Sequence, residues 1–354
     1  MPLLARMVGV PLAVDIRAGA VGALAPLLAD ARISTGGRVA VAVGPGQGEE
    51  IASIVGSTLE RAQVLHVSGG TLESAQLLAA ALRQGSYDAV VGIGGGRLLD
   101  TAKWAATMTG LPMVACATNL AHDGIASPVA SLEQDGRKSS HGVQMPLGVI
   151  VDLDYVRRSP ARMRRSGVGD VVSNLSAVAD WELAAGVLGE SVDGIAITIS
   201  RTAAMALVQR TDSIDDDAFL TALAEALVLS GLAMAVAGSS RPCSGGDHEL
   251  LHAVDELYPG TSNHGELAGV GALFMAFLRE DDAMQRTIDD CLLRHSLPRV
   301  PADLQLSSEQ FVQAVLHAPT TRPGRYTVLE HLGMDEKRTR MQVKRFEAAF
   351  SLGP

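Results

Sequence analysis

Aromatic residues, cysteines and an excess of basic residues are all missing or scarce in this chain of 354 residues. Aromatic side chains make up 3% of it, and the three cysteines, Cys116, Cys243 and Cys291, are far apart. Three scattered cysteines predict no disulfide framework and favour a reducing compartment, the cytoplasm. Basic residues number 29 against 39 acidic ones, which gives a net charge of -10. Such an acidic chain is not typical of proteins that bind nucleic acid or anionic membranes, so we expect neither partner.

Hydrophobic runs of membrane-spanning length are also missing from the sequence. The most apolar internal stretch, residues 226–238, is shorter than the ~18–20 residues that cross a bilayer, and we expect a buried helix there. The apolar N-terminal stretch is interrupted by Arg6, Pro11 and Asp15. It therefore does not predict a signal peptide.

Hydrophobic residues nevertheless make up 47% of the chain, and at ~100–200 residues per domain its length predicts about two domains with ample cores. The first part alternates apolar, β-branched runs with helix-like segments. This alternation predicts right-handed βαβ units and a mostly parallel sheet. Asp135-Gly136 lies between alternating segments and predicts a hairpin. The expected strands are residues 38–44, 64–67, 87–96, 112–118 and 149–153.

After about residue 160 the pattern changes to long segments with helical periodicity and few β-branched runs. This pattern predicts an all-α domain. We place the boundary at Ser159-Pro160, with a Rossmann-like nucleotide-binding α/β domain at 1–159 and a helical metal- and substrate-binding domain at 160–354. Because no Gly/Ser linker separates them, we expect the two halves to pack closely and to form a cleft.

A glycine-rich turn, GIGGGRLLD at 92–100, lies where an expected strand meets an expected helix. Consecutive glycines let the backbone approach a ligand closely, and the free N–H groups of the following helix suit a pyrophosphate. The alternative is a tight strand-to-helix connection that binds nothing. The motif differs from G-x-G-x-x-G and follows the third expected strand, so by itself it is weak support for an ordinary Rossmann enzyme.

His248-Glu249-Leu250-Leu251-His252 matches the H-E-x-x-H pattern of zinc metalloproteases. The third position after the second histidine is Asp255, where the extended motif of one protease class has glycine. A protease would also leave the nucleotide-type first half unexplained. We therefore favour another interpretation of these histidines.

Asp170, His248 and His264 form a second candidate set of metal ligands. Each is flanked by glycine at an expected helix start. One carboxylate and two imidazoles leave coordination positions open for water and substrate, as a catalytic metal requires. The alternatives are a helix cap for Asp170 and surface positions for the histidines.

Several stretches together resemble the sn-glycerol-1-phosphate dehydrogenase family, within the superfamily of iron-containing alcohol dehydrogenase, glycerol dehydrogenase and dehydroquinate synthase. They follow the family's order over about two-thirds of the chain, and HDGIASP followed by GD..SN..A..DWELA is specific to the glycerol-1-phosphate branch. The matching stretches are GIGGGRLLDTAK (92–103), ATNLAHDGIASPVASL (117–132), GVGDVVSNLSAVADWELA (167–184), SGGDHELLHAVD (244–255), NHGELAGVG (263–271) and RYTVLE (325–330).

The resemblance implies a nucleotide-binding domain, a helical domain of the dehydroquinate-synthase type and an active site in the cleft. It carries the family's metal ligands onto Asp170, His248 and His264. Asp123 and His252 match catalytic and substrate-binding positions. The resemblance implies NAD or NADP binding by Gly94, Gly95, Gly96, Asp100, Lys103, Thr118 and Ser127.

The resemblance implies reversible reduction of dihydroxyacetone phosphate to sn-glycerol 1-phosphate. The metal is expected to be Zn²⁺, with Ni²⁺ and Fe²⁺ as alternatives, and the chain is expected to form a homodimer or higher homo-oligomer. Ala117 and Ala121 depart from the family pattern beside the cofactor. Other interpretations are an alcohol or polyol dehydrogenase with a different substrate, a dehydroquinate-synthase-type cyclase, and a non-catalytic nucleotide-binding protein.

Overall fold

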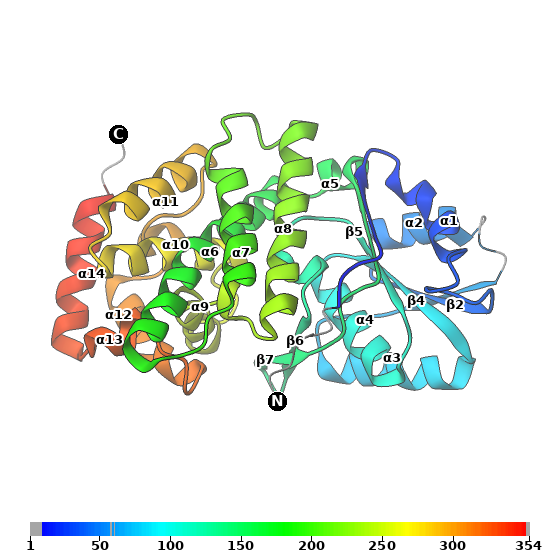
Figure 1. The fold of residues 1–354 in the computed structure, drawn as a ribbon, viewed down its shortest axis with the longest axis horizontal. Helices are drawn as coiled ribbons and strands as arrows, with labels where there is room; N and C mark the ends of the chain where they lie inside the picture. Colours follow the sequence, from blue (N-terminus) through cyan, green and yellow to red (C-terminus); the bar gives the residue numbers. More distant parts are fainter. Residues whose placement is uncertain (1–8, 57–58, 60, 352–354) are drawn as a thin grey trace. The chain divides into compact units, whose positions relative to one another are not determined.

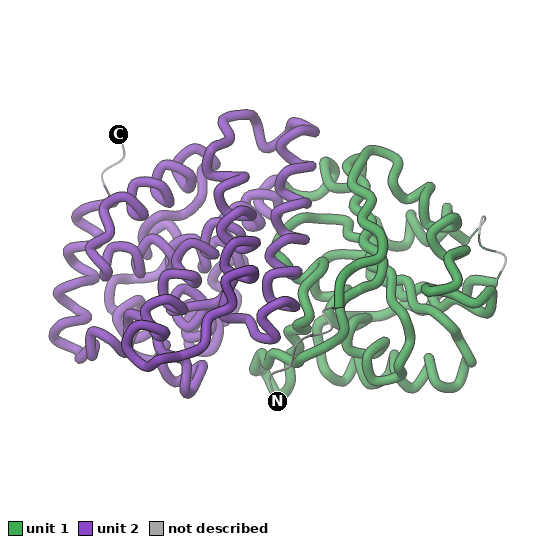
Figure 2. Tube along the Cα trace, in the orientation of Figure 1, with its two compact units in different colours: residues 1–160 green, residues 161–354 purple. Residues whose placement is uncertain are grey.

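The computed structural model describes residues 9–56, 59 and 61–351. The chain divides into two compact units, residues 1–160 and 161–354 (Figure 2). The first contains a parallel sheet with helices, and the second consists of helices. The predicted fold class, an α/β domain followed by an all-α domain, is therefore confirmed. The predicted boundary at Ser159-Pro160 lies beside this division.

The sheet of the first unit has six strands in the order β1-β8-β5-β4-β2-β3, and every neighbouring pair is parallel. Figure 1 labels β2, β4 and β5 of this sheet. The edge strand β1 was not expected from the sequence, because Asp15 interrupts its apolar pattern and Pro11 lies just before it. It is held by β8, from Ala13 beside Gly148 to Arg17 beside Asp152. The strands are β1 (Ala13–Arg17), β2 (Arg38–Val43), β3 (Ala62–His66), β4 (Tyr87–Gly94), β5 (Met113–Ala117) and β8 (Gly148–Asp152).

Side chains alternate between the two faces of the sheet, and both faces are covered. Val39, Val41 and Val43 of β2 belong to one apolar cluster that also contains Ile51 of α2. The intervening Ala40 and Ala42 point to the opposite face and are fully buried. Burial on both faces is typical of parallel sheets. The helices are α1 (Leu24–Leu28), α2 (Gln47–Gly56), α3 (Leu72–Gly85), α4 (Gly96–Thr109) and α5 (Leu153–Arg158), with 3-10 turns at η1 (Ala20–Ala23) and η2 (Asp123–Ile125).

The predicted hairpin is confirmed. Strands β6 (Val129–Gln134) and β7 (Arg137–Gly142) pair antiparallel. Asp135 and Gly136 both have positive φ, 52° and 75°, as a two-residue hairpin turn requires.

The strand order creates a switch point between β2 and β4. In the sheet, β3 lies on one side of β2 and β4 lies on the other, although β2, β3 and β4 follow one another along the chain. Ligands of open α/β sheets bind outside the carboxyl ends of the strands at such a point. Here those ends continue into Gly44-Pro45-Gly46 and into the glycine turn at residues 94–96.

The second unit is a set of packed helices that begins with the 28-residue helix α6. α10 packs against α6 and α9, and these three helices carry the candidate metal ligands. The helices are α6 (Ala161–Leu188), α7 (Gly194–Val208), α8 (Asp217–Ala237), α9 (Gly246–Leu257), α10 (His264–Leu278), α11 (Asp282–Arg294), α12 (Ser308–Thr321), α13 (Val328–Leu332) and α14 (Glu336–Phe350), with 3-10 turns at η3 (Arg241–Cys243) and η4 (Pro301–Leu304).

Two helices of the described chain, α6 and α8, are long and apolar enough to cross a membrane by length and composition alone. The apolar stretch that we expected to be too short belongs to the 21-residue helix α8, so the argument from length was wrong. Burial within the structure is a better criterion than length for distinguishing a core helix from a membrane-spanning one. The most apolar windows of α6 and α8 are 56% and 72% buried within the structure, as is common for core helices of folded proteins.

Candidate active site

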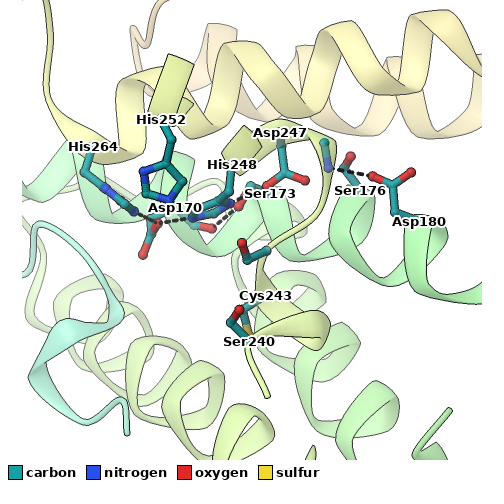
Figure 3. A network of polar contacts seen from close by, with 12 residues as sticks. Asp170, Ser173, Ser176, Asp180, Ser240, Cys243, Asp247, His248, His252 and His264 are labelled. Carbon is teal, nitrogen blue, oxygen red and sulfur yellow. Dashed lines mark hydrogen bonds and ion pairs between the residues drawn. The ribbon is translucent and has the colours of Figure 1, made fainter. Parts of the chain in front are cut away.

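Asp170, His248 and His264 come together from three helices (Figure 3). Their ligand atoms all lie within 4.8 Å of one another. Oδ1 of Asp170 is 3.8 Å from Nε2 of His248 and 3.4 Å from Nε2 of His264. Asp170 and His248 are buried, and the His264 side chain is 33% exposed. The arrangement presents one carboxylate and two imidazole nitrogens to a common point.

Asp170 does not lie at a helix start, so that part of the sequence interpretation was wrong. Helix α6 begins at Ala161 and continues through Gly167 and Gly169 to Leu188. The two glycines remain helical because α6 is packed into the unit, where tertiary contacts outweigh their low helix propensity. His248 is the third residue of α9, and His264 is the first residue of α10.

Glycines permit the close helix contacts that bring the three ligands together. A Cβ atom on Gly169 would lie 2.2 Å from the main-chain oxygen of Gly265, and one on Gly265 would lie 1.7 Å from that of Ser166. Where α10 meets α9, a Cβ on Gly271 would lie 2.7 Å from the main-chain oxygen of Asp247. Because these neighbours are backbone atoms, no side-chain rotation can relieve the contacts. The glycines beside the ligands therefore set the distance between the helices.

His248 is held between two carboxylates. Its Nδ1 lies 2.5 Å from Oδ2 of the fully buried Asp247, which leaves Nε2 directed towards Asp170. Burial by itself lowers the pKa of His248, but the two carboxylates outweigh it and raise the pKa to about 10. Burial also raises the pKa of Asp170, but its contacts with His248 and His264 hold that pKa well below the usual range. The electrostatic field of Asp170 and Asp247 therefore favours a positive charge where the candidate ligand atoms meet.

Asp180 fixes the start of α9, from which His248 projects. Its Oδ2 accepts a hydrogen bond of 2.8 Å from the N–H of Gly246, the first residue of α9, and its Oδ1 accepts another from Val328. Arg279 pairs with the same carboxylate at 2.5 Å. A carboxylate is favourable at a helix N-terminus because it satisfies N–H groups that have no partner within the helix.

Glu266 holds the turn that carries His264. Its Oε2 accepts a hydrogen bond of 3.1 Å from the N–H of Asn263, and it pairs with Arg162 at 2.7 Å. The N–H of Gly265 donates to Oγ of Ser166 on α6. These contacts hold the first turn of α10 without using the His264 ring.

The H-E-x-x-H residues do not form a protease site. His252 lies outside the ligand cluster, its ring centroid 6.4 Å from that of His248, and its Nε2 is 2.8 Å from Nη2 of Arg322. Oε2 of Glu249 accepts a hydrogen bond of 3.1 Å from Oγ1 of Thr327. Burial and the nearby Glu330 raise the pKa of Glu249 to about 9. A carboxyl that stays protonated at neutral pH cannot serve as a general base.

In the first unit, the predicted cofactor glycines lie at the junction of β4 and α4. Gly94 ends β4, Gly95 caps α4 and Gly96 is its first residue. A Cβ on Gly95 would lie 2.4 Å from the side chain of Asn119, and one on Gly96 would lie 2.0 Å from Nε2 of His122. The glycine turn therefore faces the segment after β5, which was not expected to approach it so closely.

Asp100, Lys103 and Ser127 form a buried network that joins α4 to the start of β6. Nζ of Lys103 lies 2.9 Å from Oδ1 of Asp100 and donates to the main-chain oxygens of Ser127 and Val129. Oδ2 of Asp100 accepts a hydrogen bond from the N–H of Ser131. The Lys103 side chain has no exposed surface. In this structure Lys103 orders the segment that contains Ser127.

Thr118 and Asp123 lie on the segment between β5 and β6. Thr118 is buried, and its N–H donates to the main-chain oxygen of Gly94 at 3.0 Å, so it lies beside the glycine turn. Asp123 is half-buried and begins η2.

The sequence interpretation missed the residues that hold His248 and His252 in place. Asp247 directly precedes His248, and a carboxylate beside a ligating histidine is a common orienting partner, so its position in the sequence could have suggested this role. Asp180 and Arg322 are far from their partners along the chain. No local sequence pattern indicates those contacts.

Comparisons with known proteins agree with this architecture. Residues 15–160 match the family model described as iron-containing alcohol dehydrogenase. A glycerol-1-phosphate dehydrogenase (NAD(P)+) from Cenarchaeum symbiosum is 39% identical over 263 residues, covering 73% of this chain and 72% of that protein. One from Thermofilum pendens is 38% identical over 294 residues, covering 80% of this chain and 84% of that protein.

Solved structures share the fold at lower sequence identity. A probable glycerol dehydrogenase from Sinorhizobium meliloti 1021 aligns with a TM-score of 0.78 at 21% identity, over 99% of this chain and 100% of that one. A maleylacetate reductase from Agrobacterium tumefaciens aligns with a TM-score of 0.75 at 17% identity, over 98% of each chain.

Proposed function

The chain belongs to the glycerol-1-phosphate dehydrogenase family, and on that premise we propose that it reversibly reduces the ketone of dihydroxyacetone phosphate to sn-glycerol 1-phosphate with NADH or NADPH. The observation that carries the proposal is the convergence of Asp170, His248 and His264 on one point. A candidate ligand set suited to a catalytic metal, in a chain 38–39% identical to glycerol-1-phosphate dehydrogenases, supports this function.

The residues present fit a divalent metal ion. Two imidazole nitrogens and one carboxylate oxygen form a donor set that Zn²⁺ takes in catalytic sites, where a further position stays open. Asp247 accepts from Nδ1 of His248 and so directs Nε2 towards the ligand point. We assign Zn²⁺ as the ion, with Ni²⁺ and Fe²⁺ as alternatives that accept the same ligands.

When bound, the ion supplies Lewis-acid polarisation of a ketone oxygen, and a nicotinamide supplies the hydride. The chain's own residues hold the ion and orient the substrate. Asp170, His248 and His264 hold the ion, and Asp123 and His252 contact the substrate. Because Nη2 of Arg322 donates to Nε2 of His252, a neutral His252 ring carries its proton on Nδ1. His252 is our candidate for the group that relays a proton to the product oxygen.

The cofactor is assigned to the first unit. The N–H groups at the start of α4 suit a pyrophosphate, and Gly94, Gly95 and Gly96 allow it to approach. Thr118 lies beside this turn. Asp100 and Lys103 act by ordering the segment that carries Ser127, which supports a role for them in shaping the cofactor site.

The compartment and the assembly state are part of the proposal. None of the three cysteines is in a disulfide, and all three are buried, which supports a reducing compartment, the cytoplasm. We propose a homo-oligomer, with a dimer as its smallest form.

The function is tested by following NADH and NADPH absorbance with dihydroxyacetone phosphate and the purified metal-loaded protein. We expect cofactor oxidation that a chelator stops and that added Zn²⁺ restores. Product formed without net cofactor oxidation would instead identify a cyclase. Turnover that withstands complete removal of the metal would contradict the metal assignment.

Both cofactors are expected to support turnover. The loop after β2 is Gly44-Pro45-Gly46, with no carboxylate to repel a 2′-phosphate and no arginine to bind one. Glu50 is held by Arg158 at 2.7 Å, and Glu49 lies 3.7 Å from His66. Steady-state kinetics should give kcat/KM values for NADH and NADPH within about 100-fold, or about 2.7 kcal/mol. A larger preference would mean that the adenosine ribose lies elsewhere.

A further inference from the structure

The first turn of α4 carries an arginine directly after the glycine turn. Arg97 is the second residue of α4, one position after Gly96, and it is exposed. The glycine turn is the part of the chain to which the pyrophosphate of the cofactor is assigned above. The dipole of a helix disfavours positive charge in its first turn. The stability of α4 therefore does not explain why a cation stands at this position.

The Arg97 side chain extends towards the loop between β3 and α3. A Cβ atom on Gly70 of that loop would lie 2.7 Å from Nε of Arg97 and 3.2 Å from its Nη2. The main-chain N–H of Gly70 also donates to the main-chain oxygen of Arg97 at 3.2 Å. Gly70 has a φ of 85°, which residues with a side chain rarely adopt. The guanidinium group therefore lies against backbone that has no side chain of its own.

The same turn of α4 also contacts the end of β2. A Cβ on Gly44, which follows β2, would lie 3.7 Å from Cδ1 of Leu98, and one on Gly69 would lie 3.4 Å from Cα of Leu98. In the sheet, β2 lies between β4 and β3, and β5 lies on the other side of β4. Figure 1 labels β2, β4, β5 and α4. The Arg97 side chain therefore extends from the turn after β4 to the loop after β3, on the side away from β5.

This direction corresponds to the adenosine half of the proposed cofactor. Ligands of open α/β sheets lie across the carboxyl ends of the strands at the switch point, which here falls between β2 and β4. Asp123, the proposed substrate contact, lies after β5. Because the nicotinamide must meet the substrate, it belongs on the β5 side of the glycine turn. The adenosine then lies on the opposite side, towards the ends of β2 and β3, where Arg97 extends.

The carboxylates at this end of the sheet have other partners. Glu49 lies 3.7 Å from Nδ1 of His66, and Glu50 pairs with Arg158 at 2.7 Å. Among the residues that the structure describes, no carboxylate forms an ion pair with Arg97. A negatively charged group that approaches Arg97 therefore meets an exposed cation whose charge is not already balanced.

We propose that Arg97 binds the 2′-phosphate of NADP(H) and is the residue that distinguishes the phosphorylated cofactor from NAD(H). The inference rests on the proposed function, from which it takes the cofactor site. In NADP(H) the 2′-phosphate belongs to the ribose whose 5′ carbon carries the pyrophosphate, so a long side chain from the pyrophosphate turn can reach it. Guanidinium N–H groups match phosphate oxygens, and a nearby arginine accommodates a 2′-phosphate in dinucleotide-binding folds. The loop after β2 has no cation of its own.

Binding is tested by titrating the metal-loaded protein with NADPH and with NADH in the absence of substrate, following the fluorescence of the bound nucleotide. In Arg97→Met the Kd for NADPH should rise about 10-fold or more, because charge-assisted hydrogen bonds to phosphate are lost. The Kd for NADH should stay within about threefold, because NADH has no group for Arg97 to bind. Arg97→Lys keeps the charge and should recover part of the loss. Methionine is a good helix former, so α4 is expected to persist.

Arg83→Met is the matched control. Arg83 is exposed in the last turn of α3, at the end of that helix away from Gly70, and its Nη2 donates to the main-chain oxygen of Met108 at 3.1 Å. This variant should bind both nucleotides as the wild type does. An equal loss of affinity for NADPH and NADH in Arg97→Met would show that Arg97 contacts a group common to both cofactors, such as the pyrophosphate. That result, or unchanged affinity for both, would overturn the assignment.

Kinetics separate this inference from the proposed function. With dihydroxyacetone phosphate, kcat/KM for NADPH should fall about 10-fold in Arg97→Met, and that for NADH should stay within about threefold. If the wild type does not reduce dihydroxyacetone phosphate, the proposed function fails, and the binding titration still decides the role of Arg97. If it reduces this substrate but Arg97→Met leaves the ratio of the two nucleotide affinities unchanged, the proposed function stands and the assignment of Arg97 fails.

Discussion

The His264→Ala variant is expected to lose reduction of dihydroxyacetone phosphate by about 1,000-fold or more in kcat/KM, because several kcal/mol of transition-state stabilisation depend on the metal. His264 supplies one of the three candidate ligand atoms that lie within 4.8 Å of one another. Its removal leaves Asp170 and His248, which are too few to hold a catalytic ion firmly. Metal analysis of the purified variant should therefore give well below one ion per chain.

The fold is expected to survive this substitution. The first turn of α10 is held by Glu266, Arg162 and the N–H of Gly265, none of which uses the His264 ring. The His264 side chain is also 33% exposed, so its truncation leaves no closed cavity in the core. We expect circular dichroism spectra like those of the wild type.

His317→Ala provides the matched control. His317 is 34% exposed on α12 of the same unit, and it pairs with Glu256. An exposed pair of this kind contributes about 0–1 kcal/mol to stability, and its loss should leave activity and metal content unchanged. Full activity of His264→Ala, or one ion per chain in that variant, would contradict the assignment of the ligand.

The second large effect is expected for Gly169→Ala. A Cβ at this position would lie 2.2 Å from the main-chain oxygen of Gly265, and no rotamer change can relieve that contact. The crossing of α6 and α10 must widen, which moves His264 away from Asp170. Overpacking of this kind costs about 1–3 kcal/mol or more, and we expect both a lower free energy of unfolding and at least about a 10-fold loss of metal affinity.

Gly186→Ala is the control for Gly169→Ala. Gly186 lies in the same helix, and a Cβ there would have no atom within 4 Å. Since alanine is favoured over glycine in a helix by about 1 kcal/mol, this variant should be as stable as the wild type or more stable. Urea unfolding with and without metal, together with metal titration, measures both properties. Equal stability and equal metal affinity of the two variants would show that the close crossing is not what positions the ligands.

Much of the local structure could be predicted because it depends on short-range patterns. Alternation of β-branched runs with helical segments predicted the strands of the sheet except β1, and Asp135-Gly136 predicted the hairpin. β1 was missed because its apolar pattern is interrupted, and the partner that stabilises it, β8, follows more than 100 residues later. Asp170 was wrongly assigned to a helix start because a local signal, its neighbouring glycines, was taken as a helix end. Glycine indicates a helix end locally, whereas here the glycines serve a tertiary contact inside α6.

Local patterns in the sequence determined the fold class, because a glycine turn and a helical period are properties of short segments. Residue chemistry made Asp170, His248 and His264 one candidate ligand set, and the resemblance to a known family selected it. Only the tertiary structure decided which neighbours those residues have. It separated His252 from the ligand cluster and turned Glu249 towards Thr327. The physical reason is that such contacts depend on how closely helices approach one another, and backbone atoms at Gly169 and Gly265 set that distance between segments about 100 residues apart along the chain.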